Sequence, residues 1–145
     1  MHLGQEDLLA LTDVQRAHLV DCGVSLGVSS HSLWELCRAA ALAPRYVACG
    51  PVWPTLTKAM PWHAQGTHNL SWWCRMSPAP VVAIGGILDA ERVRIAAQCG
   101  ADGVCVVRGI GNDATSTVPA FDRARAEGAA MSGETAATDL PRPSL

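Results

Sequence analysis

Lysine is nearly absent from this sequence: Lys58 is the only one, and arginine supplies the rest of the eleven basic side chains. With no basic cluster and a formal net charge of −2, the chain has no electrostatic footprint for nucleic acid. It also has no apolar run approaching the roughly 18–20 residues of a membrane-spanning helix. Residues 1–7 lack the basic and apolar regions of a secretory signal peptide, which predicts a cytoplasmic location.

Closely spaced cysteine pairs are missing too. None of the six cysteines falls in the C-x-x-C spacing of a zinc or redox site. In a reducing cytoplasm we expect them to be thiols, buried or on helix faces. The 145 residues are 49% hydrophobic and 17% charged, which is typical of an ordinary globular protein and predicts one domain.

Short β-branched runs alternate with helical stretches. Nearly continuous apolar runs predict strands buried on both faces over residues 24–28, 46–49, 81–84 and 104–107, and residues 2–4 predict the stub of another. Helices are predicted over 12–22, 32–42, 70–76, 89–99 and 119–130. Ser32 and Glu35 form a capping box, and Asp89 is an N-cap. This alternation predicts an α/β fold with a parallel sheet and functional residues at the carboxyl ends of the strands.

Five segments in consecutive order resemble the motifs of thiamine-phosphate synthase. They are HLGQED (2–7), LGVSSHS (26–32), GPVWPTLTK (50–58), VAIGGI (82–87) and GADGV (100–104). The resemblance covers about residues 1–110 and implies part of a (β/α)₈ barrel, from the end of strand 4 through strand 8. We therefore expect a barrel segment over 1–130 and a disordered tail over 131–145, which is rich in Ala, Thr, Ser, Gly and Pro.

The resemblance implies a transferase of thiamine biosynthesis. The family joins hydroxymethylpyrimidine diphosphate to hydroxyethylthiazole phosphate and releases pyrophosphate, using Mg²⁺. Such a reaction needs positioning and charge stabilisation more than covalent catalysis. The expected partners are these two small molecules, with no nucleic acid and no membrane.

Family roles carry over by resemblance to nine positions. Asp7 is the expected Mg²⁺ ligand, while Ser29 and Lys58 are expected to contact the pyrimidine diphosphate and to be the catalytic residues. The thiazole phosphate contacts are expected at Thr55, Leu56, Thr57, Gly86, Val107 and Arg108. The residue types suit these tasks, since lysine is a compact cation and glycine lets a phosphate approach the backbone. The side-chain role of Arg108 is open, because the family often has a small hydroxyl residue there.

Several residues have a second interpretation. Asp7 also fits an exposed loop or N-cap aspartate, with Gln5 and Glu6 as supporting loop residues. His31 has the properties of an acid or base near neutral pH, as in related thiazole tautomerases. Trp72 and Trp73 either cover the substrates as a lid or, as we favour, pack their helix onto the barrel.

A barrel of this kind needs eight strands and usually more than about 200 residues. The family's first half carries a basic motif and an Asn-Asp pair with another Mg²⁺ ligand, and neither is found here. We therefore expect little or no synthase activity from this chain alone, and self-association through open sheet edges. Two other functions stay open: a thiazole tautomerase, and a noncatalytic phosphate-binding or regulatory fragment.

Overall fold

Five short parallel strands form the only sheet in the described part of the chain, residues 1–56 and 63–132 of a computed structural model. The sheet runs in sequence order, β1-β2-β3-β4-β5, and every neighbouring pair is parallel. The strands are β1 (His2–Leu3), β2 (Gly27–Ser30), β3 (Tyr46–Cys49), β4 (Val81–Ile84) and β5 (Gly103–Cys105). The predicted α/β class with a parallel sheet is therefore confirmed.

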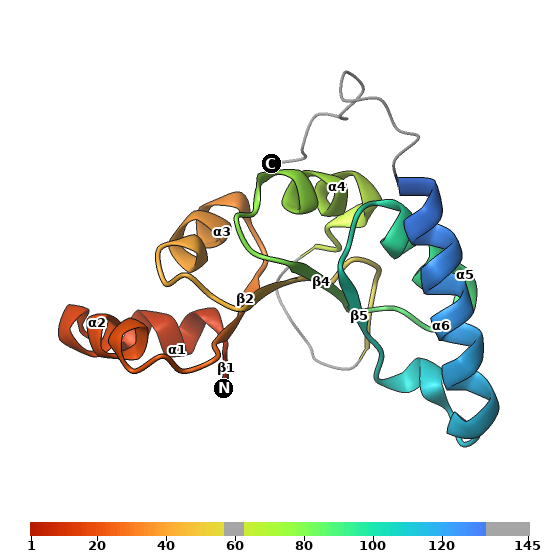
Figure 1. Cartoon of the computed structure of the whole chain (residues 1–145), viewed down its shortest axis with the longest axis horizontal. Coiled ribbons are helices and arrows are strands. Elements are labelled where there is room, and N and C mark those ends of the chain that lie inside the picture. Colours follow the sequence, from red (N-terminus) through yellow and green to blue (C-terminus); the bar gives the residue numbers. More distant parts are fainter. Residues whose placement is uncertain (57–62, 133–145) are drawn as a thin grey trace.

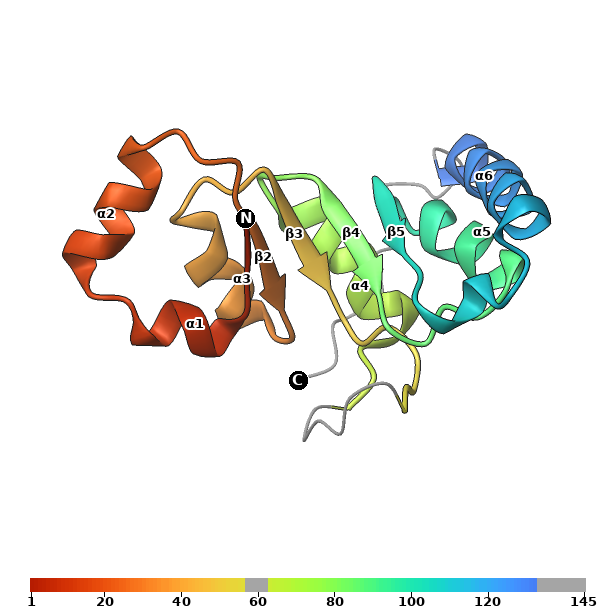
Figure 2. The same cartoon turned by 90° about the horizontal axis from the view of Figure 1, so that it is seen from below.

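Helices connect the strands and lie mainly on one face of the sheet. They are α1 (Gln5–Ala10), α2 (Asp13–Asp21), α3 (Leu33–Ala40), α4 (Gly66–Met76), α5 (Ala90–Gln98), a 3₁₀ turn η1 (Arg108–Ile110) and α6 (Ala114–Met131). Helices α3, α4 and α5 cover one face (Figure 1), whereas Figure 2 looks onto the opposite face, which none of these described helices covers. Helices α1 and α2 extend beyond the β1 edge, and α6 packs against α5. None of the helices in these ranges is long and apolar enough to cross a membrane.

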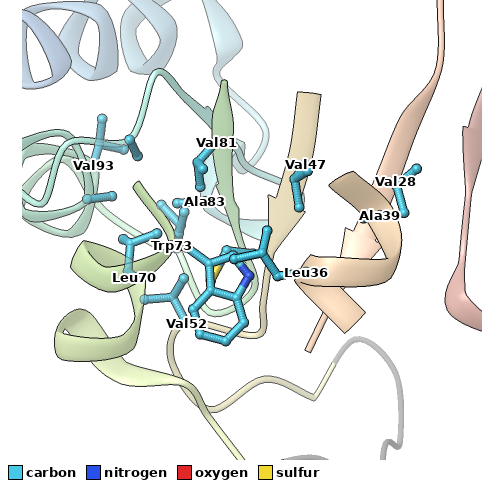
Figure 3. Packing of buried hydrophobic residues seen from close by; sticks show 14 of the residues in the cluster. Val28, Leu36, Ala39, Val47, Val52, Leu70, Trp73, Val81, Ala83 and Val93 are labelled. Atoms are coloured by element: carbon cyan, nitrogen blue, oxygen red, sulfur yellow. The ribbon is translucent and has the colours of Figure 1, made fainter. Parts of the chain in front are cut away.

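The hydrophobic core lies between the sheet and helices α3, α4 and α5 (Figure 3). Trp73 of α4 is its largest fully buried side chain, with 1% of its surface exposed. The Trp73 indole N–H donates to Ser30 Oγ over 3.3 Å, so its one polar atom is satisfied inside the core. The packing interpretation is thus confirmed for Trp73, and the lid interpretation is wrong for it.

Two strands differ from the sequence prediction. The segments 46–49 and 81–84 are confirmed, but the strand predicted over 24–28 runs over 27–30, since Val24 and Ser25 lie exposed ahead of the sheet. Ser29 therefore lies inside β2 rather than beyond it, paired with Ala48 of β3. The last strand ends at Cys105 instead of residue 107, because the chain turns into η1 at Arg108.

The helix caps largely follow the sequence. Ser32 and Asp89 accept from the backbone N–H groups of Glu35 and Arg92, and Thr12 caps α2. The Glu35 carboxylate, however, bonds to the backbone N–H of His31 instead of closing a capping box on Ser32.

Three helices begin earlier than predicted or were not predicted. Helix α4 begins at Gly66 and α6 at Ala114, where Asp113 caps the first turn and Pro119 lies inside the helix. The loop predicted at residues 5–7 is the start of helix α1. The tail over 133–145 lies outside the described residues.

Candidate functional site

The carboxyl ends of the parallel strands gather the loops that the sequence singled out. Gly4 follows β1, His31 follows β2, residues 50–56 follow β3, Gly85 and Gly86 follow β4, and η1 comes after β5. Parallel strands place all these ends at one edge of the sheet, as in other α/β proteins. Most of the predicted site residues are therefore brought to one side of the molecule by topology alone.

Ser29 belongs to a chain of hydrogen bonds across three strands. Its hydroxyl lies 2.9 Å from His2 Nε2, and His2 Nδ1 lies 3.0 Å from the Tyr46 hydroxyl. The His2 and Tyr46 rings are stacked with centroids 5.6 Å apart. Burial, then the positive charge of the N-terminus, lowers the pKa of His2, and Asp7 opposes the shift only in part. A neutral His2 ring therefore orients the Ser29 hydroxyl on the helix-free face.

The lowered pKa of His2 predicts a pH-dependent stability. At pH values below 6.5, the ordinary pKa of histidine, His2 binds a proton more readily in the unfolded chain than in the folded chain. The free energy of unfolding therefore falls as the pH drops from 6.5 towards the lower pKa of the folded state. We expect a His2→Gln variant to lose this part of the pH dependence, measured by urea unfolding at pH 7.5 and pH 5.5. A matched His68→Gln change, at an exposed histidine, should leave it in place.

Asp7 lies in the first turn of α1, where its Oδ2 accepts from the backbone N–H of Gly4 over 2.8 Å. Its side chain is exposed beyond the β1 end. A carboxylate here suits one ligand position of Mg²⁺, which is typically held by one or two carboxylates plus substrate oxygens. Residues 1–56 and 63–132 contain no group of three or more His, Cys, Asp or Glu side chains placed to hold a metal.

Gln5 has a larger structural role than the sequence indicated. It is buried, its side-chain amide donates to the Ser29 carbonyl over 2.6 Å, and Arg38 donates to its oxygen over 3.3 Å. These bonds fix the start of α1, and hence Asp7, against β2. In the sequence, the signal for this structural role was a glutamine just after a predicted strand and two residues before Asp7, the expected Mg²⁺ ligand.

The loop after β3 is fastened to the end of β4. The backbone N–H of Val52 donates to the Ile84 carbonyl over 2.9 Å, and that of Trp53 donates to Gly85 over 3.1 Å. Gly86 has φ +72°, and a Cβ there would lie 2.6–2.8 Å from Trp53 and from the Pro54 carbonyl. Glycine at 86 is therefore required by the close approach of this loop.

Two arginines flank this junction. Arg92 donates to the Gly86 carbonyl over 2.5 Å and stacks over Trp53 at 5.7 Å. Sequence reasoning missed Arg92, although a cation in the first turn of a helix opposes the helix dipole and so indicates a compensating contact. From the next loop, Arg108 Nη2 reaches Thr55 Oγ1 over 3.5 Å.

The structure thus brings Thr55, Gly86 and Arg108 together, with exposed Val107 beside them. Leu56 is almost fully exposed, at 89%. Thr57 and Lys58 lie outside the described residues, so their predicted contacts stay predictions.

His31 is held by Glu35 of α3 and by Gln65, which directly precedes α4. Its backbone N–H donates to Glu35 Oε2 over 2.6 Å, its ring Nδ1 lies 3.1 Å from the same oxygen, and Gln65 donates to its carbonyl over 2.7 Å. Glu35 is buried, at 9% exposure. A carboxylate that fixes one ring nitrogen is the usual way of orienting a catalytic imidazole, and it also serves as a structural brace.

The stem of the 53–65 segment is closed by backbone bonds. The N–H of Gln65 donates to the Pro51 carbonyl over 2.7 Å, and that of Gly66 donates to Val52 over 2.9 Å. The two ends of the segment are therefore fixed side by side next to His31.

The cysteines are free thiols, as expected. Burial raises the pKa of Cys49 and Cys99, and it raises that of Cys74 to about 12. These three side chains are therefore protonated at neutral pH and poor nucleophiles.

Known proteins are similar to most of this chain. A family model described as thiamine monophosphate synthase matches residues 1–110. A thiamine-phosphate synthase of Rhizobium etli is 50% identical over 113 residues, covering 76% of this chain and 52% of the relative. One from Serratia proteamaculans is 45% identical over 111 residues, covering 76% of this chain and 50% of the relative.

A solved structure is also similar. The thiamine phosphate pyrophosphorylase of Pyrococcus furiosus superposes with a TM-score of 0.70 at 27% identity, covering 88% of this chain and 59% of that one. The present chain spans about half the length of the curated relatives it matches. On the extent of these matches, the chain belongs to the thiamine monophosphate synthase family.

Proposed function

We propose that this chain is the C-terminal part of a (β/α)₈ barrel, with β1 as the end of strand 4 and β5 as strand 8. Two observations support the proposal: the parallel strand order β1 to β5, and the match to about half of each curated relative. The barrel's remaining strands would then come from outside these residues. The six free thiols agree with the cytoplasm as the compartment.

The proposed reaction is the transfer of a hydroxymethylpyrimidine group from its diphosphate to the nitrogen of hydroxyethylthiazole phosphate. The methylene–oxygen bond breaks, the diphosphate leaves with the electron pair, and the thiazole nitrogen forms the new carbon–nitrogen bond. The products are thiamine phosphate and pyrophosphate. The observation that carries this proposal is the meeting of Thr55, Gly86 and Arg108 at the carboxyl ends of β3, β4 and β5 in a chain of this family.

The thiazole phosphate is proposed to lie against Thr55, Leu56, Thr57, Gly86, Val107 and Arg108. Among these, the Arg108 guanidinium supplies positive charge, since no carboxylate in the described ranges forms an ion pair with it. Backbone N–H groups after β4 and the amino end of α5 favour an anion at the same place. This arrangement fixes the acceptor nitrogen relative to the second substrate.

The pyrimidine diphosphate is proposed to contact Ser29 and Lys58, with Asp7 as one Mg²⁺ ligand. When bound, Mg²⁺ would neutralise charge on the departing diphosphate. The Ser29 hydroxyl is oriented by His2, and Gln5 holds Asp7 and Ser29 in fixed relation. Lys58 adds a compact cation for the same anion. The proposed partners are these two small molecules, and the free sheet edges are proposed to allow self-association.

Reconstitution tests this proposal. We expect the purified 145-residue chain alone to form no measurable thiamine phosphate, because half of the barrel is missing. Co-expression with the first half of the Rhizobium etli relative should yield Mg²⁺-dependent formation of thiamine phosphate and pyrophosphate. Lys58→Ala and Asp7→Asn should each lower that rate at least about tenfold, as expected for lost charge stabilisation.

The exposed Arg45→Ala, at the amino end of β3 and so at the other end of the strands from the site, is the matched control and should keep the reconstituted rate. A folded, associated pair without synthase activity would contradict the proposal.

A thiazole tautomerase is the second candidate, favoured by the His31–Glu35 pair. In that case the reconstituted protein would exchange protons on the thiazole carboxylate without coupling the two substrates, and His31→Asn would abolish the exchange. A noncatalytic phosphate-binding fragment would bind thiazole phosphate in calorimetry but release no diphosphate.

A further inference from the structure

The turn between β4 and α5 contains two backbone donors for which the described chain supplies no acceptor. Gly86 and Ile87 are both buried. Within residues 1–56 and 63–132, neither of their N–H groups donates to a carbonyl or to a side chain. Buried backbone N–H groups in folded proteins are almost always hydrogen-bonded, if not to the chain then to water or a ligand. The two donors therefore indicate an acceptor that comes from outside these residues.

The two peptide units on either side of Gly86 are each held through the carbonyl oxygen. The backbone N–H of Trp53 donates to the Gly85 carbonyl over 3.1 Å. The Arg92 guanidinium donates to the Gly86 carbonyl over 2.5 Å. Both units are trans, and in a planar trans peptide the N–H points away from the C=O. Fixing these two carbonyls therefore fixes the directions in which the N–H groups of Gly86 and Ile87 point.

Arg92 also contacts the loop after β3. Its guanidinium lies over the Trp53 ring, 5.7 Å from the ring centroid. Thr55, two residues further along this loop, lies 3.5 Å from the Arg108 guanidinium. The Arg92 side chain thus joins the start of α5, the turn after β4 and the loop that carries Thr55. Its loss would release the turn and this loop from each other.

The charge of Arg92 lies where the helix itself does not favour a cation. Arg92 belongs to the first turn of α5, near the positive end of the helix dipole. Its ion pair with Asp89 is 3.9 Å long and partly exposed to solvent, so it contributes little. An anion bound at the turn would offset the unfavourable position, because it would be attracted by the guanidinium, the dipole and the two free N–H groups together.

We propose that Arg92 is a positioning residue for a phosphate group bound at this turn. It directs the N–H groups of Gly86 and Ile87 towards the anion and holds the Thr55 loop beside them. The inference rests on the proposed function, which places the thiazole phosphate at Thr55, Gly86 and Arg108. Arg92 is not among those contacts, and it acts through the backbone of Gly86.

Steady-state kinetics of the reconstituted protein test the role of Arg92. We expect Arg92→Gln to raise the KM for hydroxyethylthiazole phosphate about tenfold or more, the usual effect of losing a charge-assisted hydrogen bond. The KM for the pyrimidine diphosphate should stay unchanged, because its proposed contacts are Ser29 and Lys58. Arg92→Lys should recover only part of the loss, since lysine keeps the charge but lacks the planar group that stacks on Trp53.

Arg94→Gln is the matched control. Arg94 lies on the same helix, but its guanidinium pairs with Glu91 and Gln98 instead of reaching the turn. The same substitution there removes an ion pair of α5 and should leave both KM values unchanged. Equal rises in the KM for thiazole phosphate in the two variants, or an Arg92→Gln variant that raises both KM values alike, would assign Arg92 a merely structural role and overturn the inference.

A binding measurement separates this inference from the proposed reaction. In isotope-labelled reconstituted protein, hydroxyethylthiazole phosphate should shift the amide resonances of Gly86 and Ile87, whereas the unphosphorylated alcohol should not. Arg92→Gln should lose these shifts at the same ligand concentration, and Arg94→Gln should keep them. A protein that behaves in this way but forms no thiamine phosphate would refute the reaction and support the inference. Wild-type protein without the shifts, or Arg92→Gln protein that retains them, would overturn the inference whatever the catalytic rate.

Discussion

Replacing Trp73 by alanine should lower the free energy of unfolding by about 3–5 kcal/mol, the usual loss when a large aromatic side chain leaves a packed core. Trp73 is 1% exposed and packs among Leu36, Val52 and Leu70 (Figure 3). The change also removes the indole donor to Ser30, the neighbour of Ser29. Urea unfolding followed by circular dichroism measures the loss.

Trp34→Ala is the matched control, because Trp34 lies on α3 with 77% of its surface exposed. Its effect should stay within about 0.5 kcal/mol, as for most surface substitutions. Trp73→Phe should fall between the two, since it keeps an apolar ring and loses the donor. Equal losses for Trp73→Ala and Trp34→Ala would show that α4 does not anchor the core.

Replacing Gly86 by alanine should destabilise the chain by about 2–5 kcal/mol and displace the loop after β3. Left-handed backbone costs a side-chain-bearing residue about 1–2 kcal/mol, and overpacking adds about 1–3 kcal/mol. The added methyl group would meet Trp53 and the Pro54 carbonyl, which the fold cannot move cheaply because Trp53 is bonded to Gly85. Thermal and urea unfolding report the stability, and binding of thiazole phosphate by calorimetry reports the loop.

Gly23→Ala separates the two contributions. Gly23 has φ +64° with nothing within 4 Å of an added Cβ, so only the backbone penalty applies. We expect a loss of about 1–2 kcal/mol there and no change in ligand binding. If both variants lost the same free energy of unfolding, the close approach of the loop to Gly86 would contribute nothing measurable to stability.

Strands and caps were predictable where local chemistry decides them. The runs 46–49 and 81–84 have apolar side chains without interruption, and Asp89 and Ser32 cap their helices as their residue types require. The displacement of β2, which begins three residues later and ends two residues later than predicted, was not predictable in this way. Its bounds follow from the register against β1 and β3, which places Ser29 opposite Ala48.

The site was predictable as a set of loops but not as a set of contacts. Resemblance identified Thr55, Gly86 and Arg108, whereas the Arg92–Trp53 stack and the Gln5–Ser29 bond depend on three-dimensional packing. The His2–Ser29 bond joins residues 27 apart in sequence and arises only because β1 and β2 are neighbours. Position along a chain does not show which side chain restrains another.

The closed stem at Pro51–Val52 and Gln65–Gly66 also bears on how this protein can evolve. Because main-chain bonds hold both ends of the segment at a fixed separation, changes in its length or composition are not transmitted to β3 or to α4. Loop-closure entropy grows only slowly with length, so insertions there are tolerated energetically. The bonds of Pro51, Val52, Gln65 and Gly66 can therefore keep β3 and the start of α4 in place when residues between them change.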